Sequence, residues 1–115
     1  MTIRIVKTPI PLAEIAAMAE AQFGDMVKAV ADVEQKTIAI GGELHADEVA
    51  AMLEDGSLQE NLWGINLYPE KPGQEWIEFD SMINIRPSQG NRARDVENPE
   101  LRARIVKIVG SLVSR

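Results

Sequence analysis

The stretch EWIEFDSMINIRPSQGNR, residues Glu75 to Arg92, carries the clearest structural pattern in the chain. From Trp76 to Arg86, successive residues fall into two sets with the two-residue period of an extended strand. The expected core face holds Ile77, Phe79, Ser81, Ile83 and Ile85, and the expected open face holds Trp76, Glu78, Asp80, Met82, Asn84 and Arg86. An antiparallel sheet with one packed and one open side suits this pattern. The polar open face is therefore where we expect function.

A loop is expected to follow this strand. Pro87 has no backbone N–H to donate, and Gly90-Asn91 is a turn-forming pair. The backbone N–H groups of the loop, with the guanidinium groups of Arg86 and Arg92 on either side, are suited to bind a carboxylate or phosphate. The candidate ligand-binding residues are Arg86, Gly90, Asn91, Arg92, Asn84 and Asn66. The alternative is a structural role, in which the arginines tie the loop to Asp80, Glu78 or a helix end.

Other stretches are predicted to form the rest of the sheet. Residues 62–68 alternate, with Trp63, Ile65 and Leu67 on one face, and they are expected to pair with the strand that begins near Glu75. Residues 3–6 predict a short first strand. Residues 26–42 are interpreted as a hairpin that turns at 34–36. Because this turn lacks glycine and asparagine, a helix through Val33 is the alternative.

Three segments have the apolar spacing of helices. The first runs from Pro11 to a stop at Gly24, and the second has Asp47 at its start and Gly56 as its cap. The third is capped by Asn98 and continues to Leu112. Together these elements predict one α+β domain over residues 1–115, with about five mostly antiparallel strands and three helices packed on one face.

Composition narrows the class of protein. The 115 residues include no cysteine, which excludes disulfides, thiolate nucleophiles and sulfur-ligated metal sites. The net charge of −6 argues against nucleic-acid binding, which depends on a basic surface. No targeting or membrane-spanning segment is recognised, so we expect a cytoplasmic protein without membrane association.

Charge is unevenly distributed along the chain. Residues 84–115 carry seven basic and three acidic side chains, whereas the preceding 83 residues carry five basic and fifteen acidic ones. This asymmetry suits an anionic ligand at the basic end or attraction between copies of the chain. The alternative is a basic helix face that is simply solvated by water.

Three blocks resemble a known family: GGELHAD at residues 41–47, LWGINLYP at 62–69 and FDSMINIRPSQGNR at 79–92. They look like the corresponding blocks of the bacterial family called domain of unknown function 5674. The resemblance covers nearly the full chain. It implies family membership, but no activity, cofactor or catalytic residue follows from it.

Two sets of residues are candidates for chemistry. Glu43, His45 and Asp47 lie two residues apart, so in an extended segment they would project to one side, as metal ligands or an acid/base set must. Such ligands would suit manganese, magnesium or iron better than structural zinc. The alternative is a histidine that makes local hydrogen bonds before a helix. Glu78 and Asp80 would share a strand face, roughly 7 Å apart at Cβ, which is compatible with carboxylate-pair chemistry. The alternative is a solvated sheet face near Arg86.

No Ser-His-Asp signature is recognised around Ser81 or Ser88. The sequence therefore favours a non-enzymatic binding or interaction module without a cofactor. A small anionic ligand and a second copy of the chain are its expected partners. The alternative is a small hydrolase or transferase acting on an anionic substrate, with or without a metal. Its candidate catalytic residues are Glu43, His45 and Asp80, and Arg86 and Arg92 would hold the substrate.

Overall fold

A computed structural model describes residues 2–115 of the chain. Within them lie the helices α1 (Leu12–Ala21), α2 (His45–Glu54) and α3 (Pro99–Leu112). The strands are β1 (Arg4–Val6), β2 (Ile10–Pro11), β3 (Val27–Asp32), β4 (Thr37–Ile40), β5 (Leu62–Leu67), β6 (Ile77–Glu78) and β7 (Val113–Ser114). Four short 3-10 turns occupy Gln59–Asn61, Gly73–Trp76, Met82–Asn84 and Pro87–Gln89.

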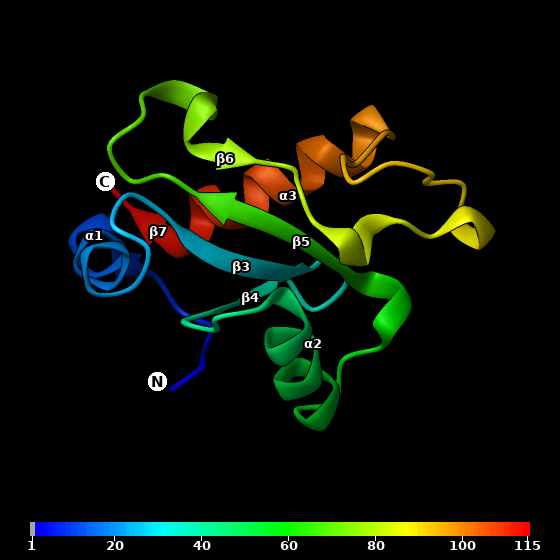
Figure 1. Ribbon diagram of the computed structural model, residues 1–115, viewed down its shortest axis with the longest axis horizontal. Helices are drawn as coiled ribbons and strands as arrows, with labels where there is room; N and C mark the ends of the chain where they lie inside the picture. Colours follow the sequence, from blue (N-terminus) through cyan, green and yellow to red (C-terminus); the bar gives the residue numbers. More distant parts are fainter. Residues whose placement is uncertain (1) are drawn as a thin grey trace.

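The main sheet has the order β1-β4-β3-β5-β6, and every neighbouring pair in it is antiparallel. A second, two-stranded sheet pairs β2 in parallel with β7, which brings the C-terminal end of the chain beside the start of α1 (Figure 1). The predicted α+β domain with a mostly antiparallel five-stranded sheet is confirmed.

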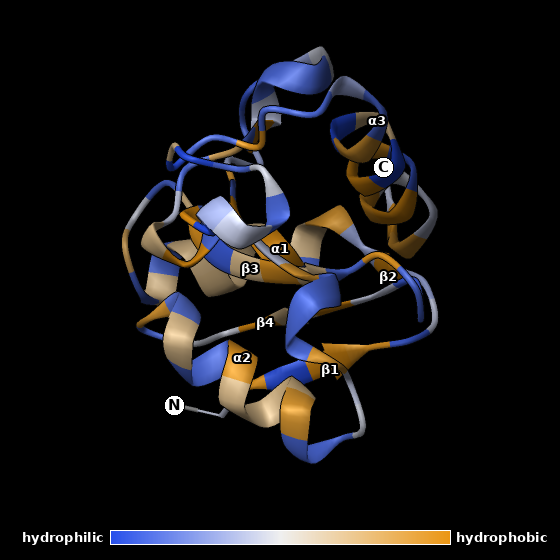
Figure 2. Cartoon of the chain, turned by 90° about the vertical axis from the view of Figure 1, so that its right-hand side faces the viewer, coloured by the Kyte–Doolittle hydropathy of each residue, from blue (hydrophilic) through white to orange (hydrophobic). Residues whose placement is uncertain are grey.

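The helices lie on both faces of the main sheet, so the prediction that all three pack on one face is wrong. Buried residues of α1 and α3 pack with Ala29 and Ala31 of β3. Met52 of α2 packs instead with Val30 and Ala39. Successive strand residues point to opposite faces, and α2 therefore covers the side away from α3 (Figure 2). Val30 on one side of β3, and Ala29 and Ala31 on the other, are buried because a helix lies on each side.

The strand predicted from Trp76 to Arg86 is much shorter in the structure. It does pair antiparallel with β5, as expected, but it ends at Glu78. The hydroxyl oxygen of Ser81 accepts a hydrogen bond from the backbone N–H of Ile83, which starts a 3-10 turn in place of the strand. Ile85, expected in the core, is 39% exposed, while Asn84 is fully buried. Alternation in the sequence was therefore not sufficient to predict an extended backbone here.

The predicted hairpin at residues 26–42 is confirmed, with β3 and β4 as its strands. Its turn is stabilised by the buried carboxylate of Asp32. One oxygen accepts from the backbone N–H groups of Glu34 and Gln35, both at 2.9 Å, and the other accepts from the hydroxyl of Ser57 at 2.6 Å. Lys36 takes the left-handed conformation, with φ of 58°, that glycine or asparagine often supplies.

The helix ends follow local rules. The side chain of Asn98 accepts from the N–H groups of Glu100 and Leu101 at the start of α3, as predicted. Gly56 follows α2 with φ of +105°, as its predicted cap. None of the helices in residues 2–115 has the length and apolar character needed to cross a bilayer.

Gly64, in the middle of β5, allows the loop after β6 to approach the sheet closely. An added Cβ there would lie 2.6 Å from Cβ of Ser81 and 3.0 Å from a side-chain carbon of Ile83. The side-chain amide of Asn84 meets the same residue: Oδ1 accepts from the N–H of Gly64 at 2.8 Å, and Nδ2 donates to its carbonyl at 2.9 Å. This side chain makes the hydrogen bonds that a neighbouring strand would make.

We expect Gly64→Ala to lower the free energy of unfolding by about 1–3 kcal/mol, because the new methyl group forces the loop away from the sheet. Gly110→Ala is the matched control. Gly110 lies inside α3 with open space around its Cβ position, so alanine there should stabilise by about 0.5–1 kcal/mol. Urea unfolding measures both changes. Equal stability of the Gly64→Ala variant and the wild type would show that the close approach is unimportant.

Candidate functional site

α2 covers only part of its face of the main sheet, and the rest of that face forms a polar cleft. The cleft has a volume of about 500 Å³ and lies between β5, β6, the start of α2 and the loop after β6. Its polar lining is Lys28, His45, Asn66, Tyr68, Glu78, Asp80, Ser81 and Arg94, and its apolar lining is Met26, Leu44, Ala46, Met82 and Ile83. The positive charges of Lys28 and Arg94 balance the two negative charges of the carboxylates.

Three strands supply a row of polar side chains across the floor of the cleft. Lys28 of β3 is opposite Asn66 of β5, which is opposite Glu78 of β6. Nδ2 of Asn66 donates to Glu78 Oε1 at 2.8 Å and to the carbonyl of Asp80 at 3.2 Å. Asn66 is only 6% exposed, and its Oδ1 has no hydrogen-bond partner. This oxygen is buried beneath the floor, whereas the Glu78 carboxylate and Lys28 line the cleft.

Tyr68 and Arg94 complete the polar walls. The Tyr68 hydroxyl donates to Glu78 Oε1 at 3.2 Å, and burial together with this carboxylate raises the pKa of the phenol. Tyr68 is therefore a neutral donor at neutral pH. Nε of Arg94 donates to Asp80 Oδ1 at 2.6 Å, and both side chains are about half exposed. Such a pair contributes only about 0–1 kcal/mol, so a ligand can replace either partner at small cost.

His45 is buried at the edge of the cleft, and both of its ring nitrogens are hydrogen-bonded. Nε2 lies 2.8 Å from the carbonyl of Ile65, which can only accept, so Nε2 carries the proton. Nδ1, 2.8 Å from the hydroxyl of Ser81, must then accept the Ser81 proton. Burial and, to a smaller extent, the charge of Lys28 lower the pKa of His45. Together they outweigh the opposite effects of the Ile65 carbonyl, the Asp80 carboxylate and the Asn66 side chain. The ring is thus neutral at neutral pH.

The extended arrangement of Glu43, His45 and Asp47 is not formed. α2 begins at His45, so the three residues no longer alternate, and Glu43 and Asp47 are exposed while His45 is buried. Within residues 2–115, no three acidic or histidine side chains are close enough together to hold a metal ion. Of the candidate catalytic residues, the structure brings His45 and Asp80 into one cleft, and Glu43 does not line it.

The two arginines beside the loop at 87–92 have different surroundings. Arg86 donates from its terminal nitrogens to the carbonyls of Gln59 and Leu62, at 2.8 and 2.6 Å. Its guanidinium also stacks 3.8 Å from the centre of the Trp63 ring. Burial lowers the pKa of Arg86. Arg92 is exposed, and its backbone N–H donates to the carboxylate of Glu97. Arg86 therefore has the structural role that the sequence left as the alternative. It ties the loop to backbone carbonyl groups, however, and not to the carboxylates of Asp80 or Glu78.

The remaining loop residues shape the backbone. Gly90 has φ of 80° and ends the 3-10 turn at Pro87–Gln89. The buried side chain of Asn91 donates to the carbonyls of Asn84 at 2.7 Å, Ala93 at 3.0 Å and Asp95 at 2.7 Å. Of the predicted ligand-binding residues, only Asn66 lines the polar cleft.

Sequence analysis did not select Lys28, Tyr68 or Arg94 as site residues. Tyr68 alternates with Asn66 just beyond β5, and Lys28 alternates with buried neighbours in β3, so strand periodicity could have placed both on the open face. For Arg94 no such signal exists. It reaches the cleft because its carbonyl accepts from Ser81 N–H at 3.1 Å and from Asn84 Nδ2 at 2.9 Å.

Glu48 is a second buried titratable group on α2, outside the lining of the cleft. It is fully buried, and Oε2 accepts from the backbone N–H of Gly42 at 3.0 Å, while Oε1 has no partner. Burial raises the pKa of Glu48 to about 9, against the smaller opposing effects of the Gly42 hydrogen bond and the Lys28 charge. Glu48 is therefore a neutral carboxylic acid at neutral pH.

The fold and the cleft define a small α+β protein with a charge-balanced polar cleft on one sheet face. Residues 4–112 match the model of the family described as "Protein of unknown function (DUF5674)". The chain belongs to this family, and the resemblance found in the sequence is confirmed. Among curated proteins none is significantly similar to the chain, and the same is true of solved structures.

Glu48 makes stability depend on pH. Its pKa in the folded protein, about 9, lies above the ordinary value of 4.5, so the folded state keeps a proton that the unfolded chain releases. The stability that protonated Glu48 contributes to the folded state is fully present below pH 4.5 and is lost as the pH rises toward 9. The side chain of the Glu48→Gln variant stays neutral at every pH. At pH 8 we therefore expect its free energy of unfolding to exceed that of the wild type by a few kcal/mol, since one pKa unit corresponds to about 1.4 kcal/mol.

Urea unfolding between pH 5 and pH 9 measures this difference. The matched control is Glu54→Gln, which removes an exposed carboxylate from the other end of the same helix and should keep the wild-type slope of stability against pH. An identical slope for Glu48→Gln and wild type would contradict the assignment of Glu48 as a buried acid.

Proposed function

We propose that the protein is a non-enzymatic binding module that holds a small zwitterionic ligand in the polar cleft. The observation that carries the proposal is the row of Lys28, Asn66 and Glu78 across the floor of the cleft, which places a cation and a carboxylate on either side of a buried amide. A ligand with both a carboxylate and an ammonium group can pair with these two charges. Hydrogen bonds between charged groups are stronger than neutral ones, which favours such a ligand at the floor.

The charges of the cleft support a zwitterion over the purely anionic ligand expected from sequence. Glu78 beside Asn66 offers a carboxylate to a ligand cation. Lys28 and Arg94 offer cations to a ligand carboxylate, and Arg94 can leave its exposed pair with Asp80 to do so. The exposed apolar side chains Leu44 and Met82 at the rim suit a short aliphatic part of the ligand.

NMR titration with three classes of compound tests the proposal: free amino acids, simple carboxylates and simple amines. We expect saturable binding of one or more amino acids, with shifts at Asn66 and Tyr68, and much weaker binding of the other two classes. Glu78→Gln should weaken amino-acid binding about tenfold, because a charged hydrogen bond is replaced by a neutral one.

Glu20→Gln is the control, since it makes the same charge change on the exposed side of α1. Equal loss of affinity in both variants would indicate a general effect of charge. Binding of carboxylates as tight as that of amino acids, or no saturable binding of any amino acid, would contradict the zwitterion site.

A second candidate function is hydrolysis or acyl transfer, favoured by the contact between Ser81 and His45. The Ser81 hydroxyl donates to His45 Nδ1, while Nε2 of the same ring is held by the Ile65 carbonyl. This is the arrangement of a nucleophile, a base and an orienting group. In this function Ser81 Oγ attacks a carbonyl carbon of the substrate while His45 accepts the hydroxyl proton. His45 then gives this proton to the leaving group as the bond between the carbonyl carbon and that group breaks.

A fluorophosphonate probe distinguishes this second function from simple binding. If Ser81 is a nucleophile, its oxygen forms a bond to phosphorus, fluoride leaves, and mass spectrometry finds the adduct on Ser81. Ser81→Ala should abolish labelling, whereas Ser88→Ala, in the exposed loop after β6, should retain it. Absence of any adduct on Ser81 after prolonged incubation would exclude it as an activated nucleophile and leave the His45 contact as structural.

A further inference from the structure

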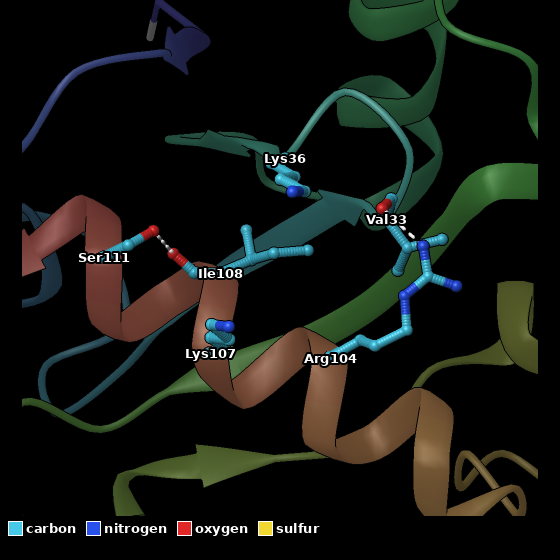
Figure 3. A pocket seen from close by; sticks show the side chains of 6 residues that line it. All are labelled: Val33, Lys36, Arg104, Lys107, Ile108 and Ser111. Atoms are coloured by element: carbon cyan, nitrogen blue, oxygen red, sulfur yellow. Dashed lines mark hydrogen bonds between the residues drawn. The ribbon is translucent and has the colours of Figure 1, made fainter.

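A second cavity, separate from the polar cleft, lies between α3 and the turn that joins β3 to β4 (Figure 3). Its volume is about 360 Å³. The lining residues are Val33, Lys36, Arg104, Lys107, Ile108 and Ser111, and none of them lines the cleft. Two segments about 70 residues apart in the sequence therefore form one hollow.

Three of these six side chains are cationic, although the whole chain carries a net charge of −6. The guanidinium of Arg104 lies 3.4 Å from a carboxylate oxygen of Glu34, and both side chains are at least half exposed. In the part of the chain that the structure describes, Lys36 and Lys107 form no ion pair. Two ammonium groups are thus available to a ligand.

The cavity walls are fixed by contacts on both sides. Arg104 donates to the carbonyl of Val33 at 2.8 Å, which ties α3 to the turn (Figure 3). The N–H of Lys36 donates to the carbonyl of Asp32 at 2.9 Å, and the Asp32 carboxylate holds the rest of the turn. The backbone that presents Lys36 is therefore already ordered, so binding an anion there does not require ordering of a loop.

We infer that this cavity binds a small phosphomonoester. The dianionic phosphate group would lie among Lys36, Arg104 and Lys107, where charged hydrogen bonds are stronger than neutral ones. The cavity is several times larger than one water molecule, and Val33 and Ile108 give it an apolar wall for the organic group of the ester. The Ser111 hydroxyl donates to the Ile108 carbonyl at 2.8 Å and can rotate to donate the same proton to a phosphate oxygen instead.

The probes are phenyl phosphate and inorganic phosphate, titrated separately into the full chain and followed by NMR. We expect saturable binding of both, with phenyl phosphate tighter because its ring contacts the apolar wall. Lys107→Gln should weaken phenyl phosphate about tenfold. Lys36→Asn should do the same without straining the turn, because asparagine also tolerates the left-handed conformation.

Two controls give this test its specificity. Lys71→Gln removes another exposed lysine, which lies away from this cavity, and it should leave phenyl phosphate affinity unchanged. Lys28→Met alters the polar cleft and should also leave it unchanged, so this result is independent of the zwitterion proposal. The inference is overturned if neither phosphate binds saturably, or if Lys71→Gln weakens binding as much as Lys107→Gln does.

Discussion

The pairing of the Asn84 side chain with the peptide groups of Gly64 is the interaction on which the cleft side of the molecule depends. β6 ends after two residues, so most of the outer edge of β5 has no strand beside it. Asn84 satisfies the N–H and the carbonyl of Gly64 with one side-chain amide. A buried edge without such partners would cost free energy for each unpaired group. The absence of a side chain at Gly64 allows the approach.

This pairing also positions chemistry. The Asn84 carbonyl is held by the buried amide of Asn91, and Asn84 Nδ2 holds the carbonyl of Arg94. The same Arg94 carbonyl accepts from Ser81, whose hydroxyl contacts His45 at the start of α2. A continuous set of hydrogen bonds therefore connects the loop after β6 to α2 across the sheet. The polar groups that line the cleft are ordered before any ligand arrives, which reduces the entropy lost on binding.

The cleft and the basic cavity lie on different parts of the fold and suit different ligands. The cleft is balanced in charge, whereas the cavity beside α3 is cationic with an apolar wall. The uneven charge along the sequence contributes to both. Arg94 from the basic C-terminal part pairs with Asp80 in the cleft, and Arg104 and Lys107 lie beside the turn at Lys36. Separate sites allow each proposal to be tested alone.

The sequence by itself determined the elements whose signals are local. The cap at Asn98 fixed the start of α3, and alternating apolar residues fixed the hairpin of β3 and β4 and the faces of β5. Tertiary structure decided what depends on distant partners. It ended β6 at Glu78, because a buried side-chain amide replaced the expected strand, and it placed α2 on the face opposite α3. It also brought Lys36 to α3 and Arg94 to His45. Side-chain hydrogen bonds and helix packing act across long sequence separations, so periodicity in a single sequence carries no record of them.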